Sequence, residues 1–584
     1  MDKFFSDRIL TPKKPTGVLA GDFRFAEEAE RQKALEYADD ALAKPFPPLT
    51  ATMYMRFSRD GNRSEYDGAS AQRRTIIMSL LLGVLAGEKK YISKLTDCVW
   101  ATCEDTSWVI PAHNVSRPYT LYGKPLPDSY DGDPPEVDLF SAETGAVLSF
   151  VYIYAKDLLD AETDVICKRI AYEIRRRIIR PYLDHEMRWI NGFINNWVPW
   201  IVSNTLICAS VFSDGEELER VIARSLGYLD VFVSTYGDDG GCNEGCSYWN
   251  AAVATLFDAC EIIAEITGDE SAFSQPGFKR MAEFAFDMCV SPETNTFVNF
   301  ADCSPRLFYD RRLIARMAKR FSSDKLASLA KQLCDPPTAA PGMMHYRYMK
   351  SRTAPLPERA AGAMPDGDAV YPDLQVATVR HGGFFLAAKG GHNRESHNHN
   401  DVGNLILYCD GDPVFIDAGV GTYRKETFSS ARYTLWTMQS SYHNLPEING
   451  FMQKDGEEYR ADRFSCGGGT AEISFAGAYP AEAGVKSVIR RASLTEAGAV
   501  VEDRADGRAV YSFMTKYKPE RTAPLTFTVG RCRIAFDGGE ATVEEVDLEN
   551  DRNLENAWKQ KNIYRIRVAA DRLVTTVTRA AAEG

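Results

Sequence analysis

Histidine is rare in this chain, and most of its copies lie in one region. Five of the eight histidines fall between positions 381 and 443, and His397 and His399 share the segment SHNHND. Asp417 ends the segment PVFIDAG, and His443 lies in SSYHNLPEING. Two imidazoles and one carboxylate form a common zinc ligand set. The pattern leaves three interpretations open: a metal site, a catalytic site or a polar turn.

The two halves of the chain that must position these residues differ in hydrophobic pattern. Up to residue 335, apolar residues recur at helical spacing, as in 71–87, 141–159, 164–183 and 250–268. After residue 376 they alternate with a period of two between Gly and Asp turns, which is typical of β-strands. Helices followed by strands predict an all-α domain and then an all-β domain, the second a sandwich. The Pro-, Ala- and Gly-rich segment 336–376 is typical of a connector.

Length, charge and cysteine content narrow the class of protein. With 584 residues the chain is too long for a single core, since cores stop growing near about 250–300 residues. A net charge of −13 argues against bulk nucleic-acid binding. No apolar run has the length of a membrane span, and the first residues lack the apolar core of a signal peptide. The 13 scattered cysteines suit reduced thiols. We therefore expect a cytoplasmic monomer or homodimer, or a periplasmic or secreted protein if a leader is removed.

A long segment of the second half carries a family resemblance. HNHNDVGNLILYCDGDPVFIDAGVGTY, followed by SSYHNLPEING, resembles the C-terminal domain signature of the heparinase II/III family of polysaccharide lyases. The segments FSAETGAVLSF, NNWVPWIVSN and DGGCNEGCSYWNAA resemble family segments in the same order. The resemblance implies an α + β fold: an N-terminal (α/α) toroid, an incomplete barrel, over 1–335, then the connector, then an antiparallel β-sandwich over 377–584.

The resemblance also divides the two neighbouring histidines between two roles. It implies a divalent metal, often zinc, bound by His399, Asp417 and His443. In this family the metal is mainly structural and ties the sandwich to the cleft. His397 would instead face the substrate.

The catalytic residues that the resemblance implies lie in the helical half. The family cleaves uronate polymers by β-elimination, in which C5 of the uronate loses a proton and O4 departs. Asn196, ahead of Asn195, would meet the uronate carboxylate, and Tyr248 would transfer protons, with Glu244 orienting its loop. Trp197 stands where some family members have a histidine. Either Tyr248 is then both base and acid, or His397 assists as the base. From the residues alone, NNW reads as a helix cap with a packing tryptophan, and Tyr248 as a core aromatic.

Loops at one end of such a toroid would line the cleft. Arg63 lies in SRDGNRSEYDGASAQRR, and Trp108 and His113 lie in SWVIPAHN. A guanidinium suits a carboxylate or sulfate, and a tryptophan could stack on a sugar ring. A solvated charged face explains the arginines equally well. Tyr423 and Arg432 could reach the substrate from the sandwich side.

The function that follows is lyase activity on an anionic oligo- or polysaccharide that contains uronic acid. Heparan sulfate, hyaluronan and chondroitin are the first candidates, and alginate- or gellan-type polymers the second. Two other classes stay open. One is a catalytically degenerate carbohydrate-binding homologue, and the other is a hydrolase in which the histidine cluster holds a metal-activated water.

Overall fold

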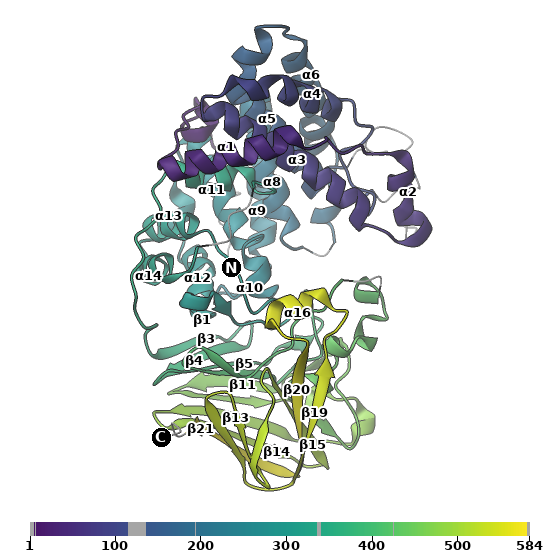
Figure 1. The fold of residues 1–584 in the computed structure, drawn as a ribbon, viewed down its shortest axis with the longest axis vertical. Helices are drawn as coiled ribbons and strands as arrows, with labels where there is room; N and C mark the ends of the chain where they lie inside the picture. The colour runs from purple at the N-terminus through teal and green to yellow at the C-terminus, as the bar shows by residue number, and fades with distance from the viewer. Residues whose placement is uncertain are drawn as a thin grey trace.

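Helices and sheets occupy separate parts of the molecule. The structure, a computed structural model, describes residues 5, 8–114, 126, 136–192, 194–335, 340–423 and 426–580. Figure 1 shows the helices stacked above a set of antiparallel sheets, with the short helix α10 at the boundary. This arrangement confirms the predicted fold class, a helical toroid followed by an antiparallel sandwich. None of the described helices combines the length and apolar composition needed to cross a membrane.

Fifteen of the described α-helices precede the sandwich strands and one interrupts them late in the chain. Their bounds are α1 Glu28–Ala43, α2 Ala51–Asp60, α3 Ser64–Leu85, α4 Ile92–Cys103, α5 Leu139–Asp160, α6 Val165–Ile174, α7 Arg180–Asp184, α8 Trp197–Phe212, α9 Gly215–Val233, α10 Gly245–Trp249, α11 Val253–Thr267, α12 Pro276–Asp287, α13 Arg311–Phe321, α14 Asp324–Gln332, α15 His345–Arg352 and α16 Arg552–Trp558.

The described strands form the sandwich, apart from one short hairpin (β1 and β2) in the helical part. Their bounds are β1 Cys289–Ser291, β2 Thr296–Phe297, β3 Gly367–Tyr371, β4 Val376–His381, β5 Phe384–Lys389, β6 His392–Asn393, β7 Leu405–Cys409, β8 Asp412–Phe415, β9 Pro446–Ile448, β10 Gly456–Arg460, β11 Arg463–Gly467, β12 Thr470–Ser474, β13 Val488–Thr495, β14 Gly498–Ala505, β15 Ala509–Thr515, β16 Glu520–Ala523, β17 Thr526–Val529, β18 Cys532–Phe536, β19 Glu540–Asp547, β20 Asn562–Ala569 and β21 Arg572–Arg579.

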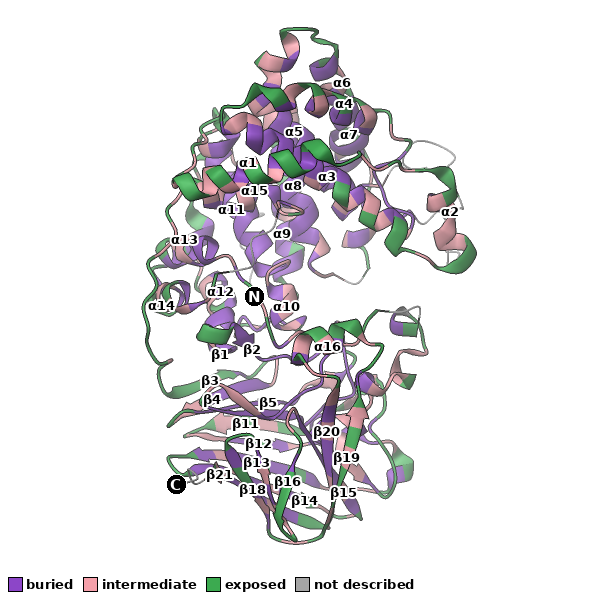
Figure 2. Cartoon of the chain, viewed as in Figure 1, coloured by how far each residue is buried: buried purple, intermediate pink, exposed green. Residues whose placement is uncertain are grey.

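Helix α5 forms the centre of the helical part. Asp138 begins it with a capping box, in which its side chain accepts from the Ser141 amide and the Ser141 hydroxyl accepts from the Asp138 amide. The helix packs against α3, α6 and α8, and its first three turns are buried all round. Figure 2 shows the same burial along α8 and α11, whereas α1 exposes one face. Helices that are apolar on every side belong in a core.

A buried ionisable cluster ties α5 to the start of α8. Glu143 accepts hydrogen bonds from the Trp200 indole (2.8 Å) and the Met344 amide (2.9 Å), and its other oxygen lies 3.2 Å from the His345 ring. Burial lowers the pKa of His345 to about 4, against the attraction of Glu143. His345 is therefore neutral in the folded protein at neutral pH.

The depressed pKa of His345 predicts a loss of stability in acid. Between pH about 6.5 and pH about 4 the unfolded chain takes up a proton at His345 while the folded chain does not, so unfolding becomes more favourable as the pH falls. The shift is worth about 3 kcal/mol at pH 4. Urea unfolding across this window should show a steeper pH slope in the wild type than in His345→Gln. Equal slopes would show that another group causes the acid sensitivity.

The segment predicted as a connector takes part in both domains. Helix α15 packs against α5 and α13 of the helical part. Strand β3 pairs with β4 along its whole length, from Gly367↔Arg380 to Tyr371↔Val376. Residues 353–366, between α15 and β3, belong to neither a helix nor a strand.

A sheet whose inner strands are buried on both faces joins the two parts. The order of this sheet is β3-β4-β5-β7-β8, and every residue of β5 and β7 is buried. Phe384 and Leu386 face the sandwich core, whereas Phe385 faces the core of the helices. Strand β13 of the eight-stranded sheet alternates buried and exposed residues instead, as a sheet with one solvated face does.

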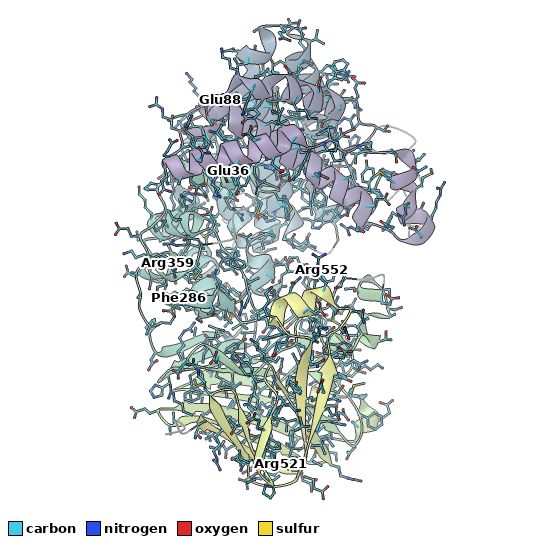
Figure 3. The ribbon with its side chains drawn as sticks, viewed as in Figure 1. Glu36, Glu88, Phe286, Arg359, Arg521 and Arg552 are labelled. Carbon is cyan, nitrogen blue, oxygen red and sulfur yellow. The ribbon has the colours of Figure 1, made fainter. Side chains whose placement is uncertain are left out.

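Polar contacts close the junction between the helices and this sheet. Phe286, labelled in Figure 3, lies near the end of α12, where the helices meet β4. Arg380 of β4 donates to the carbonyls of Phe286 (3.3 Å) and Asp287 (3.1 Å). Tyr371 of β3 donates to the Asp287 carboxylate (2.8 Å). The junction is therefore part of the folded core, and it fixes the sandwich loops against the helices.

Candidate active site and metal centre

One carboxylate from the helical part organises the junction. Asp302 follows the hairpin strand β2, and its side chain is fully buried. One oxygen accepts from His399 (3.0 Å) and from Arg432 (2.7 Å). The other accepts from His397 (3.0 Å) and from the Tyr423 hydroxyl (3.1 Å). All four donors come from the sandwich part, so Asp302 joins both domains at a single point.

Three rings gather around this carboxylate. The Tyr248 ring of α10 stacks on the His397 ring, with centroids 3.9 Å apart and planes 18° apart. The hydroxyls of Tyr248 and Tyr423 lie 2.9 Å apart. Tyr248, His397 and Tyr423 thus form one polar cluster above Asp302. The structure brings the predicted catalytic tyrosine and histidine together from segments of different domains.

An amide completes the group on the side of α8. Asn196 comes directly before α8, yet its side chain does not cap the helix. The Asn196 amide instead donates to Glu244 (2.5 Å), and the backbone amide of Asn196 donates to the other Glu244 oxygen (3.1 Å). The His397 Nε2 atom lies 3.9 Å from the same carboxylate. The neighbouring Asn195 turns the other way and accepts from the Trp197 amide (3.0 Å).

The backbone is strained at the contact between the domains. His397 and Ala301 both have positive φ angles, 55° and 62°, which few residues with a side chain adopt. The Asp302 amide donates to the His397 carbonyl at 3.2 Å, so the two strained positions face each other. Such strain persists only where the surroundings impose it, and it occurs preferentially at functional sites.

His399, Asp417 and His443 lie together beside this group. One ligand atom from each can be chosen so that all lie within 4.8 Å of one another, and all three residues are fully buried. Nδ1 of His399 and Nε2 of His443 have no hydrogen-bond partner among the described residues. The other ring nitrogens are bonded to Asp302 and to Asp417 (2.9 Å). Buried imidazole nitrogens without partners, next to a carboxylate, fit a divalent metal ion.

This ligand set predicts the effect of removing one imidazole. His443→Gln should lower the bound metal below one ion per two chains after dialysis, because the amide cannot replace a ring nitrogen in a tetrahedral site. Elemental analysis of purified protein measures this. His392→Gln is the matched control, because His392 is half-buried and belongs to the strand β6. Equal metal content in wild type and His443→Gln would remove His443 from the ligand set.

Burial and charge set the protonation of the central groups. Burial acts to raise the pKa of Asp302, but hydrogen bonds from His397 and His399 and the charge of Arg432 hold it far below its usual range. Burial raises the pKa of Tyr248 to about 12, although its hydrogen bond with Tyr423 acts in the opposite direction. Burial also raises the pKa of Glu244. At neutral pH the site therefore presents an ionised Asp302 and a protonated Tyr248.

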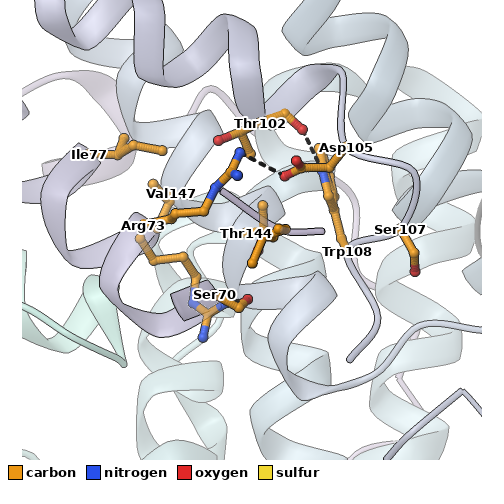
Figure 4. Close-up of a pocket in the computed structure, with 11 residues that line it drawn as sticks. Ser70, Arg73, Ile77, Thr102, Asp105, Ser107, Trp108, Thr144 and Val147 are labelled. Atoms are coloured by element: carbon orange, nitrogen blue, oxygen red, sulfur yellow. Dashed lines mark hydrogen bonds and ion pairs between the residues drawn. The ribbon is translucent and has the colours of Figure 1, made fainter. Parts of the chain in front are cut away.

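Two of the predicted substrate-binding residues are engaged elsewhere. Trp108 is only 4% exposed and lines a small pocket inside the helical part, beside the Arg73–Asp105 ion pair (Figure 4). Its indole donates to the Thr102 carbonyl (2.9 Å). Arg432 donates to Asp302, to the Asn398 carbonyl (3.0 Å) and to the Thr427 carbonyl (3.1 Å). The structure thus places Trp108 in the core and Arg432 as a support of Asp302.

Three of the other predicted substrate-binding residues form a second cluster next to Asn196. The His113 ring lies 4.4 Å from the Trp197 ring, and its Nε2 atom lies 3.1 Å from an Arg63 nitrogen. Trp197 is half-buried and the Arg63 side chain is 43% exposed. Arg63, His113 and Trp197 therefore converge from three separate segments, although only Trp197 is a sequence neighbour of a catalytic candidate.

Asp302 is the residue that the sequence analysis missed. It lies 95 positions before His397, in the segment NFADCSPR, which has no catalytic spacing of its own. The nearest local signal is the short hairpin before it, β1 and β2, at the end of the helical array. Only the docking of the sandwich loops onto that hairpin shows the role of Asp302.

Comparisons with known proteins agree on the architecture. Residues 363–566 match the family model described as heparinase II/III-like, C-terminal. No curated protein is significantly similar in sequence. Heparinase III has a similar structure, with a TM-score of 0.64 and 14% identity over 98% of this chain and 88% of that one. A mutant heparan sulfate lyase from Pedobacter heparinus has a TM-score of 0.61 and 14% identity over 97% of this chain and 86% of that one. A mutant chondroitin AC lyase from Streptomyces coelicolor A3 has a TM-score of 0.52 and 11% identity over 97% of this chain and 82% of that one. At these identities the likeness concerns the fold.

Proposed function

Because residues 363–566 match the heparinase II/III-like C-terminal family model, we propose that the protein is a polysaccharide lyase of that family. It would cleave uronic-acid-containing glycans by β-elimination and leave an unsaturated uronate on one product. The observation that carries this proposal is the assembly of Tyr248, His397 and Asn196 at the domain junction. The structural neighbours include lyases named for heparan sulfate and chondroitin, so glycosaminoglycans are the first substrates to consider.

Neutralising the uronate carboxylate is the first task of such a site, because the acidity of C5–H depends on it. The Asn196 side chain offers one amide hydrogen to Glu244 and has a second for the substrate. Glu244 accepts from both the side-chain amide and the backbone amide of Asn196, so the residue needs little reorganisation when charge develops on the substrate carboxylate. Preorganised donors of this kind usually contribute the largest part of the stabilisation.

Proton transfer falls to the stacked pair. A hydrogen bond from His397 Nδ1 to the ionised Asp302 leaves the lone pair on Nε2, the atom that lies 3.9 Å from the Glu244 carboxylate. His397 can therefore accept the C5 proton, while the protonated Tyr248 donates to the departing O4. Because burial raises its pKa to about 12, Tyr248 is protonated at neutral pH and is available as the proton donor rather than as the base. Since the two rings are stacked, removal and delivery of the proton occur on one side of the sugar, as a syn elimination.

The metal site of His399, Asp417 and His443 would support this arrangement structurally. We assign it to zinc, because two imidazoles and a carboxylate suit that ion. Its ligand residues are fully buried, which favours a structural role over a metal-activated water. His399 and His397 are both hydrogen-bonded to the Asp302 carboxylate, so that one group orients both rings.

A substrate panel tests the proposed function. The purified protein is incubated with heparan sulfate, hyaluronan, chondroitin, alginate and gellan, and the ultraviolet absorbance of a conjugated double bond is followed. We expect a rise with at least one polymer. Saturable binding without a rise in absorbance on any of them would instead identify a carbohydrate-binding homologue without turnover.

A further inference from the structure

Arg63 is held in place by a relay of buried groups. Asp138 is fully buried and accepts from His113 Nδ1 (2.7 Å). Its other oxygen caps α5 by accepting from the Ser141 amide (2.7 Å), so the carboxylate cannot turn away. With its Nδ1 hydrogen given to Asp138, His113 presents a lone pair at Nε2, which accepts from Arg63 (3.1 Å).

A second carboxylate fixes the remaining edge of the guanidinium. The Arg63 Nε atom donates to Asp67, one turn later in α3 (2.6 Å). Asp67 and His113 together occupy two of the five N–H donors of Arg63. The side chain is still 43% exposed, so its remaining donors are directed by the two fixed contacts and are available to a ligand.

The cluster borders the catalytic group. Trp197 packs its ring against His113 and follows Asn196 directly in the chain. Phe140 also stacks on the His113 ring, with centroids 5.6 Å apart and planes 6° apart. Figure 1 shows α2 and the start of α3 at the edge of the helical part that faces the sandwich. An oriented cation and an aromatic ring thus lie beside the amide that would hold the uronate.

We propose that Arg63 and Trp197 form a subsite for an acidic sugar, adjacent to the uronate that is cleaved. The Trp197 indole would stack on the apolar face of the ring, and Arg63 would pair with its carboxylate or sulfate. His113 is a positioning residue that acts through Arg63. This inference rests on the proposed function, since it assumes that an anionic glycan occupies the catalytic group.

A cavity elsewhere at the domain junction has more acidic than basic side chains in its lining, which supports this placement of the subsite. This cavity of about 490 Å³ lies between the domains, lined by residues that include Asn243 and Ser396, the neighbours of Glu244 and His397. Two arginines and one histidine line it, together with four carboxylates. The carboxylates are those of Asp239, Asp373, Glu395 and Glu457. Glu395 pairs with the buried Lys389 (3.0 Å) and Glu457 with Arg460 (3.4 Å), so this lining offers a polyanion little cationic charge. The Arg63 cluster is therefore the side that suits the next acidic sugar better.

Binding to an inactive protein tests the subsite. In a Tyr248→Phe background, calorimetry measures the affinity for a hyaluronan hexasaccharide, which carries carboxylates only, and for a heparan sulfate hexasaccharide. Arg63→Gln should weaken binding by about 10- to 100-fold, the usual cost of losing a charge-assisted hydrogen bond. Arg59→Gln, an exposed arginine of α2, is the matched control and should bind as the parent does. A larger loss with the sulfated probe would identify sulfate as the group that Arg63 recognises.

The positioning role of His113 has its own readout. His113→Phe keeps a ring in contact with Phe140 and Trp197 but removes both hydrogen bonds. It should weaken binding when Arg63 is present and add nothing in the Arg63→Gln protein, because the two act as a unit. Equal affinities of Arg63→Gln and Arg59→Gln overturn the subsite while leaving the lyase proposal intact. No binding by the Tyr248→Phe protein, together with no turnover by the wild type, overturns both.

Discussion

Replacing Tyr248 by phenylalanine is expected to lower kcat by about 10²- to 10⁴-fold, the range that a positioned proton donor contributes. The phenyl ring keeps the stacking on His397, so only the hydroxyl is lost. Without it, the departing O4 would have to leave as an alkoxide or take a proton from water. Initial rates of absorbance on the best polymer of the panel measure the effect, with metal content and the thermal midpoint checked in parallel.

The control for this substitution is Tyr172→Phe. Tyr172 is 57% exposed on α6, so its hydroxyl should contribute nothing to turnover. A Tyr248→Phe protein whose kcat stays within about threefold of both wild type and Tyr172→Phe would show that another group protonates the leaving oxygen. Tyr423, whose hydroxyl lies 2.9 Å from that of Tyr248, would be the next candidate.

Replacing Asp302 by asparagine is expected to damage the metal centre and the active site together. Asparagine has the same shape, but it removes the charge that faces His397, His399 and Arg432. Loss of a carboxylate behind a ligating histidine usually weakens metal binding by about 10- to 100-fold. The same change weakens the hydrogen bond that fixes the tautomer of His397, so kcat should fall even when the metal concentration saturates the site.

Two separate measurements distinguish these effects of Asp302→Asn. Competition with a chelator gives the metal affinity, and the rate at saturating metal gives the contribution to turnover. Asp164→Asn serves as the matched control, because that carboxylate pairs with Lys168 on the surface and is 58% exposed. Metal affinity and kcat both equal to those of Asp164→Asn would mean that Asp302 does not couple the two centres.

Local sequence patterns predicted the main helices and the strands of the sandwich. The helical periodicity in 141–159 and 250–268 corresponds to α5 and α11, and the alternation after residue 376 corresponds to the sandwich strands. The grouping of His399, Asp417 and His443 followed from the family signature, and the structure brings them together. These features are encoded within single segments or within one contiguous domain.

Contacts across the domain junction could not be predicted in the same way. Asp302 acquires its role only because four side chains of the sandwich part reach it, and no spacing in the chain records that docking. Trp108 and His113 lie on one short loop, yet one enters the core beside Arg177 and the other faces Arg63. Which way each side chain of a loop points depends on the helices around it.

The masses of the products made by the wild-type protein test the central claim most directly. The best polymer of the panel is digested to completion, and the oligosaccharides are separated and examined by mass spectrometry and ultraviolet absorbance. A β-elimination predicts new ends that absorb and weigh one water less than the corresponding hydrolysis products. Fragments that carry the added water and do not absorb would contradict the lyase assignment and indicate a hydrolase.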